Sequence, residues 1–543
     1  MLVSSAQMRE LDRRTIELGT PGLTLMERAG KGIARYLVER QRAACRRGVL
    51  VLCGRGNNGG DGFVVARLLT KAGFRCTVLL LGRRAALAGD ARSNADRWAR
   101  ARGRLIEIEQ LDAAAAALLE HKLGRCGVVL DGIFGTGLTR PIEGVAASVI
   151  EAVNRAAGGQ VVPPPHARPG RAGGRKAKKA PPAPPSVIAI DVPSGLDADS
   201  GVPLGVAIRA QVTVTLGALK PGLVLPAARP WVGELELVEI GIAEQALRAV
   251  GPFGSIGDAA TLAPLVPLRA PGAHKGTNGH LLIVAGSLGK SGAALLCGRA
   301  ALRGGAGLVT VACPADVLAT IAAGLPELMT DATHAFVARD WQRRLEGKAA
   351  LTVGPGLGTT PEAVELVRWL VTSVALPMVV DADGLNAIAG QRGVLEAARG
   401  PIVLTPHPGE MARLTGLSTA EVQAQRIAHA RTFARDSGAV VVLKGSGTVV
   451  AAPDGRWSIN TSGGPLLGTG GTGDVLAGLT GSMLAQGLEA YDAARLAAFL
   501  HGRAGDRLGW QLGDAGLLAS ELADELPQAR RELAASAVQT AGD

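Results

Sequence analysis

Short apolar runs, each followed by a glycine-rich polar turn and an amphipathic segment, recur along the whole chain. Continuous apolar runs are typical of buried strands in parallel sheets, and the amphipathic segments between them are typical of helices. The pattern therefore predicts an α/β fold with parallel sheets. In the first half we expect helices over 6–18, 25–39 and 63–71 and strands over 49–53, 76–81, 128–130, 186–190 and 234–240.

A second strand–turn–helix series begins at His280, after a seam over 250–267. A chain of 543 residues is also too long for one ordinary core. We therefore expect a domain over 1–250, a second domain over 251–530 and an Ala-rich tail over 531–543. A Pro-, Gly- and Lys/Arg-rich stretch at about 158–185 interrupts the first domain, and we expect it to be a disordered insertion.

The net charge of +11 raises the question of nucleic-acid binding. Much of this charge lies in the 158–185 stretch, where no aromatic residue is interleaved with the basic ones, so we do not expect a nucleic-acid partner. No apolar run is long enough to span a bilayer, and the first residues are charged, so we expect a cytoplasmic protein. The six cysteines show no CxxC spacing and are expected to be buried, reduced thiols.

The most informative segment is GGPLLGTGGTGDVLAGL, over 463–479. Its glycines let the backbone approach an anion closely, and the apolar run that follows begins a helix whose first N–H groups lack partners. Asp474 repels phosphate, so we interpret it as a base that takes a proton from a hydroxyl while the amides hold the developing charge. This predicts phosphoryl transfer. The alternative is a glycine-rich turn in which Asp474 only caps the helix.

Three polar clusters in the first half, over 57–62, 131–141 and 191–197, each follow a predicted strand. Because ligands bind at the carboxyl ends of the strands of open α/β sheets, these clusters are expected to converge on one site. Gly54, Gly56 and Gly59 also match GxGxxG, the fingerprint of a dinucleotide-binding dehydrogenase. The ribose-binding acid that such an enzyme needs is missing, and Arg83 and Arg84 stand in its place.

These motifs resemble a known family, the bifunctional NAD(P)H-hydrate repair enzymes. The first half is similar to the epimerase domain through LDRRTIE, GRGNNGGDG, DGIFGTGL and IDVPSGLD. The second half is similar to the dehydratase domain through HKGTNGHLLIVAGS, GPGLG, DADGLN, TPHPGEMARL, LKGSGTVV and GTGD. The resemblance implies a Rossmann-like three-layer first domain and a ribokinase-like α/β second domain. It does not extend to the basic insertion or the Ala-rich end.

The resemblance implies repair of NADHX and NADPHX, reduced cofactors in which water has added across a double bond of the nicotinamide ring. The first domain would interconvert the R and S epimers, with Asp191 moving the proton. The residues matching K⁺ ligands are Asn58, Asp131 and Ser194. Those matching hydrate-binding positions are Asn57, Asn58, Gly59, Gly60, Asp61, Gly135, Thr136, Gly137, Leu138, Thr139, Arg140, Pro141 and Asp191. Helix capping is the alternative role for Asp131 and Asp191.

The second domain would dehydrate the S epimer at the expense of ADP, with ATP less favoured, and with Mg²⁺ bridging the phosphates. Asp474 would be the catalytic base. The matching hydrate-binding residues are Ala293, Gly356, His407 and Asp474, and the matching nucleotide-binding residues are Lys444, Gly445, Ser446, Gly447, Thr448, Gly471, Thr472 and Gly473. For His407 the alternative is a local capping role, and for His501 we expect a packing role.

Two other functions fit parts of the pattern. The second domain could be a small-molecule kinase for a vitamin precursor, fused to a non-catalytic Rossmann-like binding module, since kinases of the ribokinase-like class share the glycine-rich turn and its Asp. The first domain could instead be an interaction scaffold in RNA metabolism, although it retains Asn58, Asp131 and Asp191. We also expect a homo-oligomer.

Overall fold

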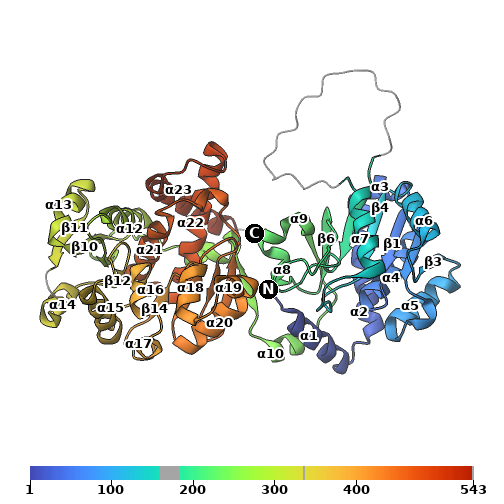
Figure 1. The fold of residues 1–543 in the computed structure, drawn as a ribbon, viewed down its shortest axis with the longest axis horizontal. Coiled ribbons are helices and arrows are strands. Elements are labelled where there is room, and N and C mark those ends of the chain that lie inside the picture. The colour runs from blue at the N-terminus through green and yellow to red at the C-terminus, as the bar shows by residue number, and fades with distance from the viewer. Residues whose placement is uncertain (159–182, 334–336, 541–543) are drawn as a thin grey trace, which may run out of the picture. The chain divides into compact units, whose positions relative to one another are not determined.

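The computed structural model describes residues 1–158, 183–333 and 337–540, the last four of these as backbone only. The chain divides into two compact units, Met1–Gly251 (unit 1) and Pro252–Asp543 (unit 2) (Figure 1). The division lies one residue beyond the boundary expected at 250. Most of the basic insertion, residues 159–182, lies outside the described residues.

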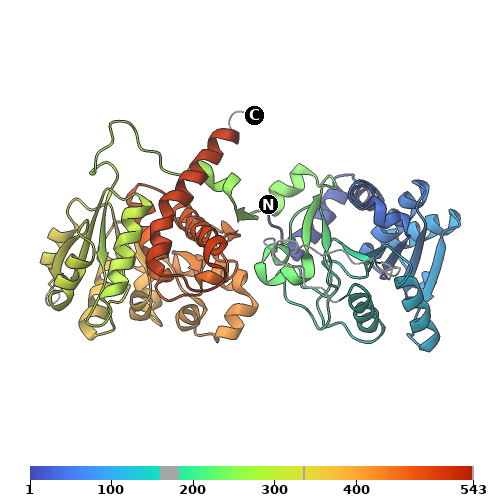
Figure 2. The same cartoon turned by 90° about the horizontal axis from the view of Figure 1, so that it is seen from above.

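Unit 1 is built on a seven-stranded sheet in the order β3-β2-β1-β4-β5-β6-β7, with all neighbouring strands parallel. Leu50 and Leu52 on one face of β1 join a core with α6 and α7, while Val51 and Cys53 on the other face lie against α4. Helices therefore cover both faces (Figures 1 and 2), and the expected three-layer fold is confirmed. The strands are β1 Val49–Cys53, β2 Cys76–Leu81, β3 Arg104–Ile108, β4 Val128–Gly132, β5 Ser186–Ile190, β6 Val212–Leu216 and β7 Glu234–Val238; the helices are α1 Ser5–Glu17, α2 Gly22–Arg40, α3 Arg42–Arg46, α4 Asn57–Lys71, α5 Gly89–Arg100, α6 Ala113–Leu123, α7 Gly144–Ala156, α8 Pro221–Val224, α9 Arg229–Val232 and α10 Glu244–Val250, with 3₁₀ turns η1 Arg84–Ala86 and η2 Pro226–Ala228.

Two local expectations in unit 1 were wrong. Helix α4 begins at Asn57, six residues before the expected start at 63, so the glycine-rich segment is the first turns of a helix and not a loop. Tertiary packing overrides the low helix propensity of glycine here, because Gly59 and Gly60 allow neighbours to approach closely. Asp131, expected in a loop, lies within β4 and is fully buried.

Unit 2 is built on a ten-stranded sheet in the order β11-β10-β9-β12-β13-β14-β15-β16-β17-β8. Its strands are parallel except for β16, which runs antiparallel to β15 and β17. The strands are β8 Gly254–Gly257, β9 His280–Val284, β10 Leu308–Pro314, β11 Met329–Thr333, β12 Ala350–Val353, β13 Met378–Val380, β14 Ile402–Leu404, β15 Val440–Leu443, β16 Val449–Ala451 and β17 Trp457–Asn460; the helices are α11 Ala259–Leu262, α12 Ser291–Gly304, α13 Ala315–Gly324, α14 Ala338–Leu345, α15 Pro361–Ser373, α16 Asp383–Ile388, α17 Arg392–Glu396, α18 Pro408–Thr415, α19 Thr419–Ala424, α20 Arg426–Ser437, α21 Thr472–Ala485, α22 Ala490–Leu512 and α23 Ala519–Thr540, with 3₁₀ turns η3 Ala263–Leu265 and η4 Pro465–Leu467.

The core of unit 2 holds α21 firmly against α12. Gly478 of α21 lies so close to α12 that a Cβ atom there would stand 2.0 Å from the carbonyl oxygen of Cys297. The same core includes buried residues of α22 and α23, among them Leu500 and Leu533. The Ala-rich segment after 530 therefore continues α23 as far as Thr540 and is not a separate tail over that length.

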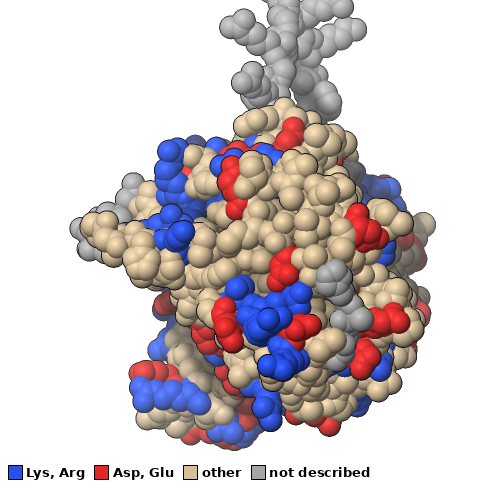
Figure 3. Space-filling view, turned by 90° about the vertical axis from the view of Figure 1, so that its left-hand side faces the viewer, with Lys and Arg blue, Asp and Glu red and all other residues tan. Residues whose placement is uncertain are grey.

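The distribution of surface charge bears on nucleic-acid binding, and the state of the cysteines bears on the redox environment. On the face of unit 2 that Figure 3 presents, Lys and Arg side chains are interspersed with Asp and Glu and form no single basic field. All six cysteines are free, five of them buried and Cys76 partly so, as expected.

Among the described residues, no helix has the length and apolar character that crossing a bilayer requires.

Candidate active sites in the two units

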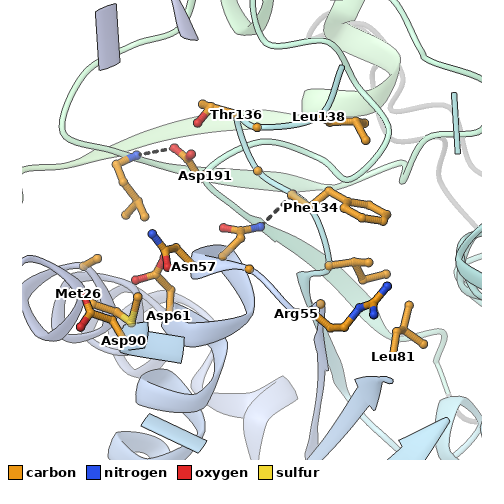
Figure 4. Close-up of a pocket in the computed structure, with 18 of the residues that line it drawn as sticks. Met26, Arg55, Asn57, Asp61, Leu81, Asp90, Phe134, Thr136, Leu138 and Asp191 are labelled. Atoms are coloured by element: carbon orange, nitrogen blue, oxygen red, sulfur yellow. Dashed lines mark hydrogen bonds between the residues drawn. The ribbon is translucent and has the colours of Figure 1, made fainter. Parts of the chain in front are cut away.

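A cavity of about 980 Å³ lies in unit 1, where the carboxyl ends of β1, β4 and β5 meet (Figure 4). The three polar clusters converge on it, as the parallel sheet predicts. The predicted residues that line it are Asn57, Asn58, Asp61, Gly135, Thr136, Gly137, Leu138, Thr139, Arg140 and Asp191.

Three predicted hydrate-binding residues do not line this cavity. A Cβ atom on Gly59 would stand 2.1 Å from the Gly54 carbonyl oxygen, and one on Gly60 would stand 2.7 Å from the Met26 sulfur. These two glycines permit close packing of α4. Pro141 is an exposed residue at the end of the 135–141 loop.

The three residues matching K⁺ ligands meet at one point in unit 1. The fully buried Asp131 accepts hydrogen bonds from the Ser194 hydroxyl (2.6 Å) and the Ser194 N–H (2.8 Å). The Phe134 N–H donates to the Ser194 hydroxyl (2.9 Å), and the side-chain amide of Asn58 donates to the Phe134 carbonyl (2.8 Å) (Figure 4). Burial raises the pKa of the Asp131 carboxyl to about 6, against the opposing effect of these hydrogen bonds. Carboxylate, hydroxyl, amide and carbonyl oxygens are therefore gathered in one place.

Asp191 projects into the cavity from the loop after β5 and is paired with Lys220, a residue that the sequence analysis missed (Figure 4). The Lys220 ammonium, which is fully buried, lies 2.5 Å from Asp191 Oδ1. It also donates to the Thr215 hydroxyl (3.1 Å) and the Leu216 carbonyl (2.8 Å). Asp191 has a φ of 64°, a strained value for a residue with a side chain. Its position is thus set by the fold and not by a helix cap.

Two further carboxyl groups with a raised pKa line the same cavity. Asp12 comes from α1 and Asp61 from α4. Burial, reinforced by the charge of Asp191, raises the pKa of Asp12 to about 6 and that of Asp61 well above its usual range. Asp12 lies in the motif LDRRTIE, but nothing in its local sequence shows that α1 reaches the cavity.

In unit 2, Asp474 is the third residue of α21, whose N-cap is Gly471 with a φ of 89°. The structure therefore places the carboxylate at a helix N-terminus, as the glycine pattern predicts. Burial and the charge of Asp381 raise the pKa of Asp474 to about 6, against the opposing charge of Lys444. A carboxyl with this pKa can accept a proton near neutral pH.

The Lys444 side chain lies between the start of α21 and the acidic residues Asp381 and Glu410, which follow β13 and begin α18. Its ammonium lies 2.8 Å from Asp381 Oδ1 and 3.7 Å from Glu410 Oε2, and a Cβ atom on Gly473 would stand 3.5 Å from it. The predicted nucleotide-binding segment, Lys444 to Thr448, is the turn between β15 and β16, closed by the Thr448 hydroxyl donating to the Gly445 carbonyl (3.0 Å). The sequence analysis missed Asp381 and Glu410.

Two other predicted hydrate-binding residues of unit 2 lie together. Gly356 has a φ of 60°, and a Cβ atom on it would stand 2.9 Å from the Ala293 side chain. Asp383, whose charge raises the pKa of Asp474, accepts a hydrogen bond from the Gly358 N–H (2.9 Å) and pairs with Lys290 (3.0 Å).

Two histidines of unit 2 that the sequence singled out, His407 and His501, have structural partners. His407 caps α18 by accepting hydrogen bonds at Nδ1 from Gly409 N–H (3.0 Å) and Glu410 N–H (3.3 Å), which was the alternative role for it. Its side chain remains half exposed. His501 is buried and bonds through Nε2 to the Thr472 carbonyl (2.8 Å), so it supports the first turn of α21. Among the described residues, no cluster of three or more His, Cys, Asp or Glu side chains has the geometry of a metal site.

Comparison with known proteins matches both units. Residues 281–528 match the model of the NAD(P)H-hydrate dehydratase family, and residues 22–222 match that of the YjeF-related protein N-terminus. The bifunctional NAD(P)H-hydrate repair enzyme of Moorella thermoacetica is 39% identical over 98% of this chain and 97% of its own length. The corresponding enzyme of Thermofilum pendens is 37% identical over 97% and 96%.

A solved structure of an ADP/ATP-dependent NAD(P)H-hydrate dehydratase from Bacillus subtilis is 32% identical, with a TM-score of 0.46, over 51% of this chain and 98% of that one. The matches to full-length relatives cover both units and confirm the resemblance seen in the motifs. The chain belongs to the family of bifunctional NAD(P)H-hydrate repair enzymes.

Proposed function

We propose that this chain repairs hydrated nicotinamide cofactors. Unit 1 interconverts the R and S epimers of NADHX and NADPHX, and unit 2 dehydrates the S epimer at the expense of ADP, with ATP less favoured. The observation that carries the proposal is the alignment of bifunctional repair enzymes with nearly the whole chain, together with a carboxylate site in each unit. The six free cysteines support a reducing compartment such as the cytoplasm.

The geometry of unit 2 suits dehydration by way of phosphorylation. Hydroxide is a poor leaving group, whereas a phosphorylated hydroxyl can be expelled by the ring nitrogen. Asp474 would take the hydroxyl proton, and the N–H groups of Gly471, Thr472 and Gly473 would stabilise charge on the transferred phosphate. Lys444 stands beside the same helix start and would bind a phosphate oxygen.

The two units differ in how they fit the implied cations. In unit 2, Lys444 already pairs with Asp381 and Glu410, and the described residues hold no group of three carboxylates with metal-site geometry, so Mg²⁺ would be held mainly by the nucleotide phosphates. When bound with nucleotide, Mg²⁺ would offset phosphate charge. In unit 1, Asn58, Asp131 and Ser194 supply hard oxygen donors around the Phe134 carbonyl, which suits K⁺. A cation there would offset the charge of the buried Asp131.

The K⁺ proposal is tested by thermal unfolding of the full chain in KCl and in choline chloride at equal ionic strength. We expect K⁺ to raise the melting temperature of unit 1, because a ligand at about 100 times its Kd stabilises the folded state by about 2.7 kcal/mol. Asp131→Asn should abolish the difference between the two salts. Equal melting temperatures of the wild type in both salts would contradict a K⁺ site.

The main activity is tested by following the return of reduced-nicotinamide absorbance from a mixture of R and S hydrates, with ADP or ATP and Mg²⁺. We expect complete recovery with either nucleotide and a faster rate with ADP. Absence of recovery from authentic S hydrate, combined with stable phosphorylation of a vitamin precursor alcohol, would instead establish the kinase alternative. Because backbone amides discriminate poorly between phosphate counts, only this direct comparison decides between ADP and ATP.

A further inference from the structure

Among the carboxyl groups that line the cavity of unit 1, Asp12 and Asp191 differ in their surroundings. Asp191 accepts hydrogen bonds at Oδ1 from Lys220 (2.5 Å), the Leu216 N–H (3.2 Å) and the Thr215 hydroxyl (3.3 Å). Asp12 has no such support: its Oδ1 is buried and has no hydrogen-bond partner among the described residues. An unpaired buried carboxylate oxygen is costly, and a bound ligand that pairs with it removes that cost.

Epimer exchange at a carbon that carries both a hydroxyl and the ring nitrogen needs an acid and a base. A base removes the hydroxyl proton as the C=O bond forms and the C–N bond breaks, and an acid gives its proton to the departing nitrogen. Rotation about the adjacent C–C bond presents the other face of the aldehyde. The nitrogen then attacks that face, returning its proton to the acid, while the base returns the other proton to oxygen. Atoms and charges balance without an added oxidant or nucleophile.

We propose that Asp12 is the acid of this step and that Asp191 is its base. This inference rests on the proposed epimerase function of unit 1 and adds a catalytic residue to it. Two carboxyl groups in one cavity can serve as acid and base when their environments differ. Here Asp191 is ion-paired with Lys220, while Asp12 has a buried Oδ1 atom without a hydrogen-bond partner.

The charges around Asp12 set the direction of its pH dependence. Facing groups are Asp191 and Lys220 from the loops after β5 and β6 and Asp61 from α4; Arg9, Asp90 and Arg140 also line the cavity. Burial and the Asp191 charge raise the pKa of Asp12 to about 6, and Lys220 lowers it. An acid must be protonated to act, so kcat/KM for epimerisation should fall as the pH rises through about 6.

The test compares Asp12→Asn with Glu17→Gln in the full chain. Glu17 lies on the same helix, is exposed and pairs with Arg13. We expect Asp12→Asn to slow epimer exchange about 100-fold or more and to remove the fall in rate at high pH, while dehydration of S hydrate is unchanged. Glu17→Gln should leave both rates unchanged. Wild-type exchange in Asp12→Asn, or a slow variant that keeps the original pH profile, would overturn the proposal.

A measurement on the wild type alone keeps the inference testable if Asp12→Asn does not fold. During epimer exchange in ¹⁸O-labelled water, ring opening retains the original oxygen, so exchange should outpace label incorporation. Incorporation of one label per exchange, or a rate that is flat between about pH 5 and 8, would overturn the proposed acid–base pair. If the wild type does not exchange epimers at all, the failure lies with the proposed epimerase function and not with Asp12.

Discussion

At the residue scale, the two key carboxylates are prepared for proton transfer by different means. Asp474 acquires a raised pKa from burial and neighbouring acids at a helix terminus. Asp191 instead sits at a strained backbone position, ion-paired with a buried lysine. In each case the carboxylate is placed by the backbone that follows a strand or precedes a helix, which explains why short motifs mark both sites.

Replacing Asp474 by Asn should lower the rate of dehydration about 10²–10⁴-fold, because the amide cannot accept the hydroxyl proton. Epimer exchange in the same protein should be unchanged. The measurement is the absorbance assay with S hydrate for dehydration and chromatography of R and S hydrates for exchange. Dehydration within a few-fold of wild type would show that Asp474 only caps α21.

The raised pKa of Asp474 predicts a pH dependence of dehydration. As a base it must be ionised, so kcat/KM should fall as the pH drops through about 6 and should be constant above it, up to the next ionisation. This is the opposite direction from the fall expected for epimerisation. A dehydration profile that is flat down to about pH 4, the usual range of an unperturbed carboxyl, would contradict the role of Asp474.

Some site residues could be predicted from the sequence, whereas those whose role depends on contacts between distant segments could not. Asn58, Asp131, Asp191 and Asp474 lie at the ends of apolar strands or in the first turn of a helix, so the local pattern points to them. Asp12, Lys220, Asp381 and Glu410 acquire their roles from tertiary packing: α1 must reach the cavity, and the end of β13 must come within reach of Lys444 across β14. No periodicity along the chain reports such contacts.

At the element scale, the position of Asp474 depends on how closely α21 packs against α12. Gly478→Ala would bring a Cβ atom to 2.0 Å from the Cys297 carbonyl, so one helix must shift. We expect a loss of about 1–3 kcal/mol in the free energy of unfolding, the usual range for overpacking, and slower dehydration. Chemical denaturation of unit 2 measures the first effect.

A matched control lies on α22. A Cβ atom on Gly509 would meet nothing within 4 Å, so Gly509→Ala should be neutral or stabilise by about 0.5–1 kcal/mol through the helix preference for alanine. Equal destabilisation by the two substitutions would show that close approach at Gly478 is unimportant.

The elements themselves were predicted more reliably than their ends. Most buried strands of unit 1 were recognised from continuous apolar runs, although the buried strand β6 was missed. The start of α4 was misplaced because Gly59 and Gly60 resemble a loop in sequence. Their lack of side chains is used instead to seat the helix against Gly54 and Met26. The half-polar strand β3 was also not predicted, since its residues are mostly exposed or half-buried and form no continuous apolar run.

At the scale of the whole molecule, each unit contains its own site, so the two activities should separate. Asp191→Asn should give a two-phase recovery of absorbance from mixed hydrates. The S epimer is dehydrated quickly, and the slow phase follows the uncatalysed conversion of the R epimer to the S epimer. Adding the Asp474→Asn protein, which retains epimerase activity, should restore a single fast phase. Persistence of two phases in the mixture would mean that substrate must pass between sites within one chain.

Because the native thiols are largely buried, cysteines introduced at the surface can be labelled selectively. Burial raises the pKa of Cys45, Cys76, Cys126 and Cys313 to about 11, so native thiolates are scarce at neutral pH. A cysteine introduced on an exposed helix of each unit should react with maleimide dyes in preference to them. Fluorescence energy transfer between the two dyes would then report the separation of the units during turnover, without removal of any native cysteine.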